Sequence, residues 1–180
     1  MHALISLLPT PYSQQVENLW DELESVCGVK GVRGTPFPHF TWTTASELSE
    51  TAVQTALSKL ARQIKPFTIA ASGIGIFPGN RPVVFIRLVK SPQLFILHEI
   101  ILNALQEPFH GTLSPLYQPD VWVPHITLGI EDVTEENLGA VVSTLVNKDF
   151  QWEMQIDNLS LISTLADGRF GMKFIHRLQA

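Results

Sequence analysis

One short pattern occurs twice in this chain of 180 residues. Proline, histidine, an apolar residue, threonine and a second apolar residue follow one another at 38–42 and again at 124–128. The surroundings repeat as well, because each copy lies in a stretch that reads as strand, helix, histidine-bearing strand, helix and strand. Two copies of one unit usually pack about a pseudo-twofold axis. This repetition therefore predicts two similar lobes whose central strands meet.

Apolar spacing and turn signals place the individual elements. Strands are expected at residues 3–8, 37–43, 67–77, 83–89, 121–129, 152–163 and 170–178. Four helices are expected: from just after Pro11 to about Gly28, from 44–47 to about Gln63, from 91–92 to about Gln106, and from 132–135 to about Val146. The segments 44–47 and 132–135 both have the form of a capping box. The predicted fold class is α+β, in a single bilobal domain over residues 1–180.

Alternation along the two central strands places the functional groups. Side chains two residues apart share one face of a strand, so His39 and Thr41 project together, and so do His125 and Thr127. If a twofold axis sets these faces opposite each other, one cleft holds two imidazoles and two hydroxyls. Imidazoles titrate near neutral pH and can divide acid and base work, and threonine hydroxyls can donate to the oxygens of a phosphate. A single His-x-Thr in a strand is usually structural, but two matched copies indicate metal-free phosphoryl chemistry.

Composition limits the partners and the location. There are 12 basic and 17 acidic residues and a net charge of −5, which argues against binding DNA or a long nucleic acid by charge alone. The one cysteine, Cys27, excludes a disulfide framework and a cysteine-rich metal site. No signal peptide or membrane span is expected, so the protein is predicted to be cytoplasmic and to have no membrane role. We also expect a monomer that needs no cofactor or metal.

The doubled His-x-Thr motif resembles that of the 2H phosphoesterases, which include 2′-5′ RNA ligase-like proteins and 2′,3′-cyclic nucleotide phosphodiesterases. The resemblance covers nearly the whole chain and implies two lobes of antiparallel sheet with outer helices around a central cleft. It implies hydrolysis of a 2′,3′-cyclic phosphate on a small nucleotide or an RNA 3′-end. His39 and His125 carry over as the catalytic pair, and Thr41 and Thr127 as the groups that hold the phosphate.

The sequence leaves the roles within this site open. One histidine would take a proton from water and the other would protonate the leaving ribose oxygen; we favour His125 as the base and His39 as the acid. The alternatives are a 2′-5′ RNA ligase-like enzyme that processes RNA ends, and a module that binds nucleotide or RNA without turnover. Binding alone would not need two titratable side chains, so the presence of both histidines argues against the binding module.

Three further residues are candidates for substrate contacts. Many family members carry an arginine shortly after the second motif, and this chain has Leu128-Gly129-Ile130 there. Arg87 interrupts an apolar strand, so it either reaches the cleft in place of that arginine or lies on an exposed edge. Tyr12 follows the first predicted strand and Trp122 precedes the second motif, and each either stacks on a base or packs in the core or on the surface.

Overall fold

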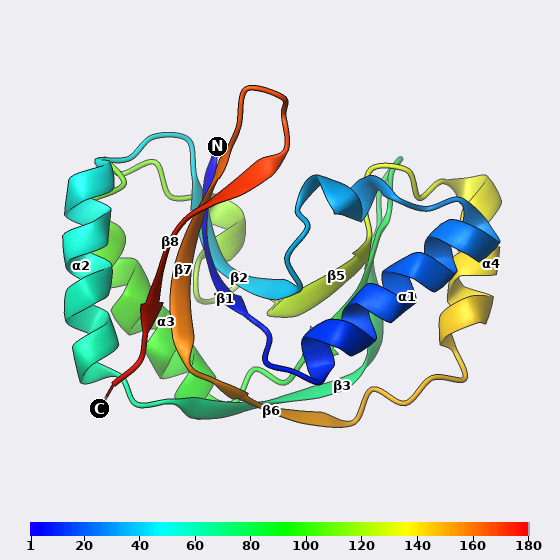
Figure 1. The fold of residues 1–180 in the computed structure, drawn as a ribbon, viewed down its shortest axis with the longest axis horizontal. Coiled ribbons are helices and arrows are strands. Elements are labelled where there is room, and N and C mark those ends of the chain that lie inside the picture. Colours follow the sequence, from blue (N-terminus) through cyan, green and yellow to red (C-terminus); the bar gives the residue numbers. More distant parts are fainter. Residues whose placement is uncertain (180) are drawn as a thin grey trace.

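The computed structural model describes residues 1–179, which form two four-stranded antiparallel sheets and four α-helices (Figure 1). The first sheet, called here the β1 sheet, has the order β2 (His39–Ala45), β1 (His2–Leu7), β7 (Asn158–Thr164), β8 (Phe170–Arg177). The second, called the β4 sheet, has the order β5 (His125–Gly129), β4 (Val83–Leu88), β3 (Phe67–Phe77), β6 (Trp152–Ile156). The bilobal α+β architecture expected from the sequence is confirmed.

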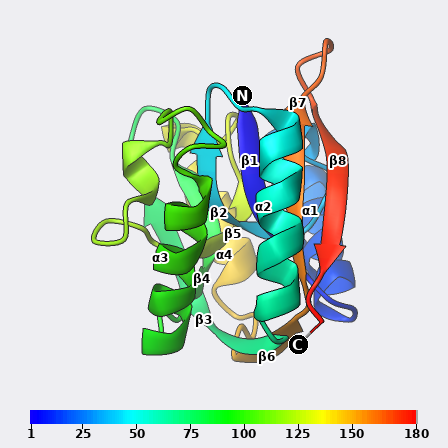
Figure 2. The ribbon, with the colours of Figure 1, turned by 90° about the vertical axis from the view of Figure 1, so that its left-hand side faces the viewer.

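The helices cover the outer faces of the two sheets. α2 (Glu50–Gln63) and α3 (Pro92–Leu105) lie side by side on the β1 sheet (Figure 2). α1 (Tyr12–Cys27) packs on β5 with α4 (Glu135–Leu145) beside it. Two short 3₁₀ helices, Gly31–Gly34 and Pro115–Tyr117, precede the two histidine-bearing strands. Among the described residues no helix is long and apolar enough to cross a membrane.

Each half of the sequence contributes to both lobes. α1 follows a strand of the β1 sheet but packs on the β4 sheet, and α3 follows a strand of the β4 sheet but lies on the β1 sheet. β3 likewise comes from the first half and lies inside the β4 sheet. The two lobes are therefore interleaved, and neither corresponds to one half of the chain.

The strand expected at residues 152–163 is in fact two strands in two sheets. β6 pairs with β3, β7 pairs with β1, and only Asp157 separates them. Because the apolar alternation continues through residues 152–163, the sequence did not indicate that the chain passes from one sheet to the other there. The buried side chain of Asn158 fixes the start of β7, because it accepts from the backbone N–H of Leu7 at 2.8 Å and donates to the Leu7 carbonyl at 3.0 Å.

Helix ends agree with the sequence except at the starts of α2 and α4. Gly28 ends α1 in the left-handed region at φ 71°, and the Ser91 side chain caps α3 by accepting from the Leu94 N–H. The capping box expected at 44–47 is wrong, because β2 continues to Ala45 and α2 starts after Ser49. The capping box expected at 132–135 is also wrong, because the box that opens α4 is formed by Thr134 and Asn137, two residues later.

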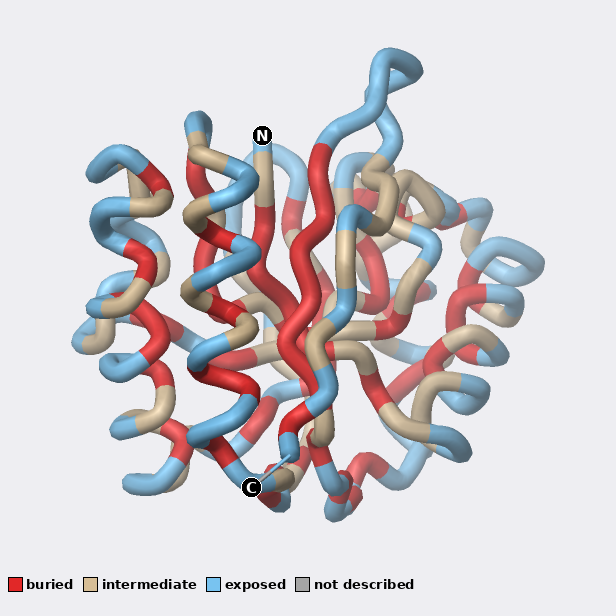
Figure 3. Tube along the Cα trace, turned by 60° about the vertical axis from the view of Figure 1, so that its left-hand side comes forward, coloured by how far each residue is buried: buried red, intermediate tan, exposed pale blue. Residues whose placement is uncertain are grey.

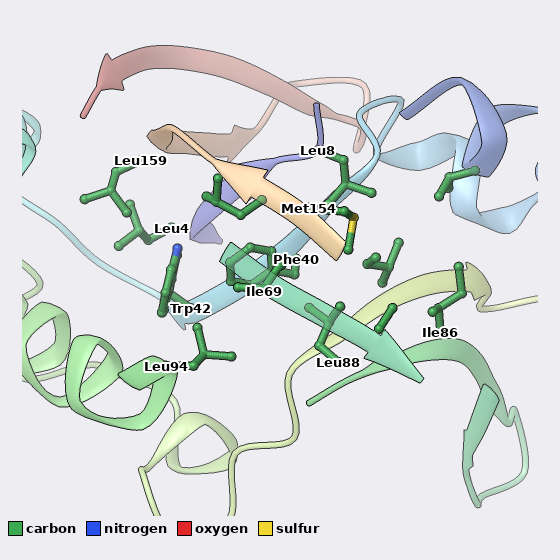
Figure 4. Packing of buried hydrophobic residues seen from close by; sticks show 14 of the residues in the cluster. Leu4, Leu8, Phe40, Trp42, Ile69, Ile86, Leu88, Leu94, Met154 and Leu159 are labelled. Carbon is green, nitrogen blue, oxygen red and sulfur yellow. The ribbon is translucent and has the colours of Figure 1, made fainter. Parts of the chain in front are cut away.

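One hydrophobic core spans both sheets, and each helix is buried along the side that faces it (Figure 3). Figure 4 shows Phe40 of the β1 sheet close to Ile69 and Met154 of the β4 sheet. A smaller cluster of Ala3, Ile5 and Ile162 lies on the other face of the β1 sheet.

Candidate active site

The two motif strands lie at the edges of their sheets and next to each other. β2 is the outer strand of the β1 sheet, β5 is the outer strand of the β4 sheet, and the two are in contact. The apolar motif residues Phe40, Trp42, Ile126 and Leu128 are fully buried. The histidines and threonines between them are only partly buried, as alternation predicts. The fold therefore brings together two His-Thr pairs that are far apart in the sequence.

Both strands carry a β-bulge immediately after the motif threonine. The register of β2 with β1 shifts after Thr41, which leaves Trp42 as the extra residue. The register of β5 with β4 shifts after Thr127, which leaves Leu128 as the extra residue. Bulges of this kind turn a side chain away from its regular direction and are common beside active sites. The local backbone geometry thus repeats along with the sequence.

Both histidines are held in the same tautomer. The Nδ1 of His39 is hydrogen-bonded to the carbonyl of Phe37, and the Nδ1 of His125 to the carbonyl of Val123 at 2.8 Å. A carbonyl only accepts, so Nδ1 carries the proton in each ring and the Nε2 of the neutral ring has a lone pair. Each ring is therefore oriented to accept or deliver a proton through Nε2.

Burial makes both rings weaker bases than a free imidazole. It lowers the pKa of His39 to about 4, an effect that the hydrogen bond to Phe37 opposes and the neighbouring His125 reinforces. It also lowers the pKa of His125. The rings of Phe77 and Phe85, with centroids 5.0 Å from the His125 ring, supply part of its apolar surroundings.

Arg87 lies beside His125. The two residues are direct partners across the β4–β5 ladder, so their side chains lie on the same face of the sheet. The Arg87 side chain is exposed, and its Nε donates to the Ser72 carbonyl at 3.4 Å. Arg87 is therefore exposed and lies on the face of the β4 sheet that carries His125, and a contact with substrate stays a prediction.

The two aromatic candidates pack in or against the core. Trp122 is 2% exposed and stacks on His98, with ring centroids 3.8 Å apart, so its ring has no free face for a base. Base stacking by Trp122 is therefore wrong, because core neighbours cover its ring. Tyr12 is partly buried, and its ring centroid lies 5.4 Å from that of Trp152.

Tyr117 is a site neighbour that the sequence did not reveal. Burial raises the pKa of its phenol, and the nearby Thr41 side chain opposes that shift to a smaller extent. Tyr117 ends a 3₁₀ helix in a proline-marked loop without periodicity, so no pattern could have placed it. Phe77 and Phe85 were missed for a different reason, because their contact with His125 depends on strand pairing.

A bound metal would need ligands that converge on one point. Within residues 1–179, no group of three or more histidine, cysteine, aspartate or glutamate side chains is placed to hold a metal ion. Cys27 lies at the end of α1, with its Sγ 3.7 Å from the Oγ1 of Thr144. The polar side chains described at the two motif strands are those of the two histidines, the two motif threonines, Tyr117 and Arg87.

Comparison with known proteins places these features in a family. Residues 10–168 match the family model of the 2′-5′ RNA ligase superfamily. A Bacillus cereus (strain G9842) protein named as an inferred phosphoesterase is 28% identical over 134 residues, which is 73% of each chain. A Bacillus anthracis (strain CDC 684) protein with the same kind of name is 26% identical over 144 residues, 78% of each chain.

Two solved structures share the fold. The protein TT0787 of Thermus thermophilus has a TM-score of 0.68 at 17% identity and covers 98% of this chain and 97% of its own. Escherichia coli LigT, solved in complex with 3′-AMP, has a TM-score of 0.66 at 20% identity and covers 99% of this chain and 98% of its own.

Proposed function

Because this chain belongs to the 2′-5′ RNA ligase superfamily, we propose that it is a phosphodiesterase that hydrolyses 2′,3′-cyclic phosphates on a nucleotide or an RNA 3′-end. The observation that carries the proposal is the meeting of two His-Thr pairs on neighbouring edge strands, each histidine with its Nε2 lone pair available. The 3′-AMP bound to the structural neighbour LigT supports a nucleotide as the ligand.

The proposed reaction needs one base and one acid. A water molecule attacks the cyclic phosphorus while the basic imidazole takes its proton. The bond from phosphorus to one ribose oxygen breaks, and the acidic imidazole protonates that oxygen. Thr41 and Thr127 donate hydrogen bonds to the phosphoryl oxygens, where negative charge accumulates. Arg87, beside His125, adds a positive charge near the same oxygens. No step requires a metal ion or cofactor.

The surroundings of the two rings favour His39 as the base and His125 as the acid. The pKa of His39 is lowered to about 4, so this ring is neutral over most of the pH range and can accept a proton. Burial lowers the pKa of His125 as well, but less far, so His125 is more readily protonated. We therefore reverse the assignment that we favoured from the sequence.

One chain supplies both halves of this site, and one core spans both sheets. We accordingly propose that the chain of 180 residues acts as a single domain and as a monomer.

The direct test is incubation with the nucleoside 2′,3′-cyclic monophosphates in the presence of EDTA. Wild type should open the ring, and His39→Ala or His125→Ala should lower kcat by about 10²–10⁴-fold, the range for general acid–base groups. His110→Ala changes an exposed loop histidine and serves as the matched control with unchanged kcat. No hydrolysis by wild type, or full activity in either site variant, would refute the proposal.

The same incubation separates the alternatives. Adding an RNA with a 5′-hydroxyl would show a joined product if the enzyme ligates ends. Tight binding of the cyclic nucleotide without any product would instead identify a binding module.

A further inference from the structure

The indole groups of the four tryptophans each donate a hydrogen bond, and two of them donate to the motif threonines. Trp122 Nε1 donates to the backbone carbonyl of Thr41 at 3.1 Å. Trp20 Nε1 donates to the backbone carbonyl of Thr127 at 3.0 Å. The same acceptor atom is therefore used in both motif strands, although the two tryptophans lie in different kinds of element.

These two carbonyls need a donor because of where they lie. β2 and β5 are edge strands, and each ladder is disrupted by the bulge that follows the threonine. A bulge removes regular pairing at that step, and a carbonyl left unpaired away from water costs about 1–3 kcal/mol. In each strand an indole N–H from outside the ladder donates to this carbonyl. It also fixes the peptide plane after the threonine, and thereby the direction of the threonine side chain.

The Trp122 bond connects the two lobes, whereas the Trp20 bond lies within the β4-sheet lobe, where α1 packs on β5. Trp20 lies on α1, which follows β1, and holds Thr127 in the β4 sheet. Trp122 lies in the segment leading into β5 and holds Thr41 in the β1 sheet.

Both indoles are themselves firmly packed. Trp122 is 2% exposed and is stacked on His98 and on Trp42, with centroid distances of 3.8 and 5.7 Å. Trp20 is 3% exposed, and the Arg33 guanidinium lies 5.6 Å from its ring centroid. A donor held in this way can fix the position of its acceptor.

We propose that Trp20 and Trp122 are positioning residues of the reaction, which orient the Thr127 and Thr41 hydroxyls toward the phosphoryl oxygens through their backbone carbonyls. The inference rests on the proposed function. The two tryptophans do not touch the substrate. Replacing them should therefore lower turnover although every group that contacts the substrate is still present.

Trp20→Phe and Trp122→Phe keep an aromatic ring but remove the donor. Each should lower kcat by about tenfold, the loss expected when one hydrogen bond that holds a group for the transition state is removed. Trp152→Phe is the matched control, because the Trp152 indole is also buried and donates at 3.1 Å to a backbone carbonyl, that of Asp149. It should lose similar stability and keep wild-type kcat. Equal kcat losses in all three variants, or no loss in the first two, would overturn the proposal.

A double-mutant cycle separates positioning from general damage. In a Thr41→Ala background the hydroxyl is already absent, so Trp122→Phe should change kcat by less than about twofold. In a Thr127→Ala background it should keep its tenfold effect. An equal effect in both backgrounds would contradict action through Thr41.

A measurement on the wild-type protein needs neither turnover nor variants that fold well. With ¹⁵N-labelled indoles, inorganic phosphate should shift the N–H signals of Trp20 and Trp122 and leave that of Trp152 in place. Phosphate binding, seen elsewhere in the spectrum, with no shift of the first two signals would refute the proposal. A wild type that neither turns over substrate nor binds phosphate would instead refute the proposed function.

Discussion

His39 and His125 occupy equivalent motif positions but have different neighbours. His125 packs against Phe77 and Phe85. The pKa of His39 is lowered mainly by burial, which the hydrogen bond to Phe37 opposes and His125 reinforces to a smaller extent. Their Nδ1 atoms are nevertheless bound alike, to a carbonyl two residues earlier in each case. Because the two rings are oriented alike but are desolvated by different neighbours, two identical side chains can take opposite roles.

The residue environments predict an acidic pH optimum for kcat/KM. The base, His39, must be unprotonated, so activity should fall as the pH drops through its pKa of about 4. The acid, His125, must be protonated, so activity should also fall as the pH rises through a pKa lowered from 6.5. A bell-shaped profile with both apparent pKa values below 6.5 is expected for the free enzyme, and these values belong to the coupled pair.

The anionic substrate favours protonated imidazoles, so the kcat profile should lie at higher pH than the kcat/KM profile. Steady-state kinetics across the pH range with one cyclic nucleotide would measure both. A kcat/KM that keeps rising through neutral pH would contradict the assignment.

At the scale of elements, the pairing of β3 with β4 shapes the surroundings of His125. Gly75 lies opposite Phe85, and a Cβ on Gly75 would come within 2.5 Å of the Phe85 ring. Because that ring is buried and packs on His125, it has little room to move. The glycine therefore allows the aromatic contact that helps to desolvate the histidine.

Gly75→Ala should displace the Phe85 ring and with it His125. We expect a fall in kcat together with a loss of about 1–3 kcal/mol in the free energy of unfolding, as for other overpacked sites. Gly139→Ala in α4 is the control, because a Cβ there meets nothing within 4 Å and alanine favours the helix. Kinetics and thermal unfolding of both variants measure the effect; wild-type kcat in Gly75→Ala would show that Phe85 does not position His125.

At the scale of the whole molecule, charge limits how much nucleic acid can be held. The net charge is −5, and several basic side chains are already paired with carboxylates. The paired side chains are Arg33, Lys148, Arg169, Lys173 and Arg177. Lys173 and Arg177 of β8 are thus each paired with a carboxylate. Arg87 lies beside the site as the partner of His125 in the β4–β5 ladder.

We expect salt to affect the reaction only weakly. For an RNA with a 2′,3′-cyclic end, one contact to a cation predicts that log kcat/KM falls against log salt with a slope of about −0.7. Arg87→Gln should reduce this slope toward zero. Comparing a short RNA with a cyclic mononucleotide over a salt series measures it, and a slope several times steeper would reveal further phosphate contacts.

The secondary-structure elements and the doubled motif can be derived from the sequence. Apolar periodicity placed most strands and all four helices, because both depend on local alternation. It also determined which side of each motif strand is buried, since Phe40, Trp42, Ile126 and Leu128 fill the core.

How these elements are combined depends on tertiary contacts. The split at Asp157, the exchange of α1 and α3 between lobes, and the neighbours Tyr117 and Phe85 depend on contacts between distant parts of the chain. The same is true of Trp20, whose indole reaches a carbonyl 107 residues away. Local patterns carry no information about such contacts, because a buried tryptophan gives the same periodicity whether its N–H meets a motif threonine or any other acceptor.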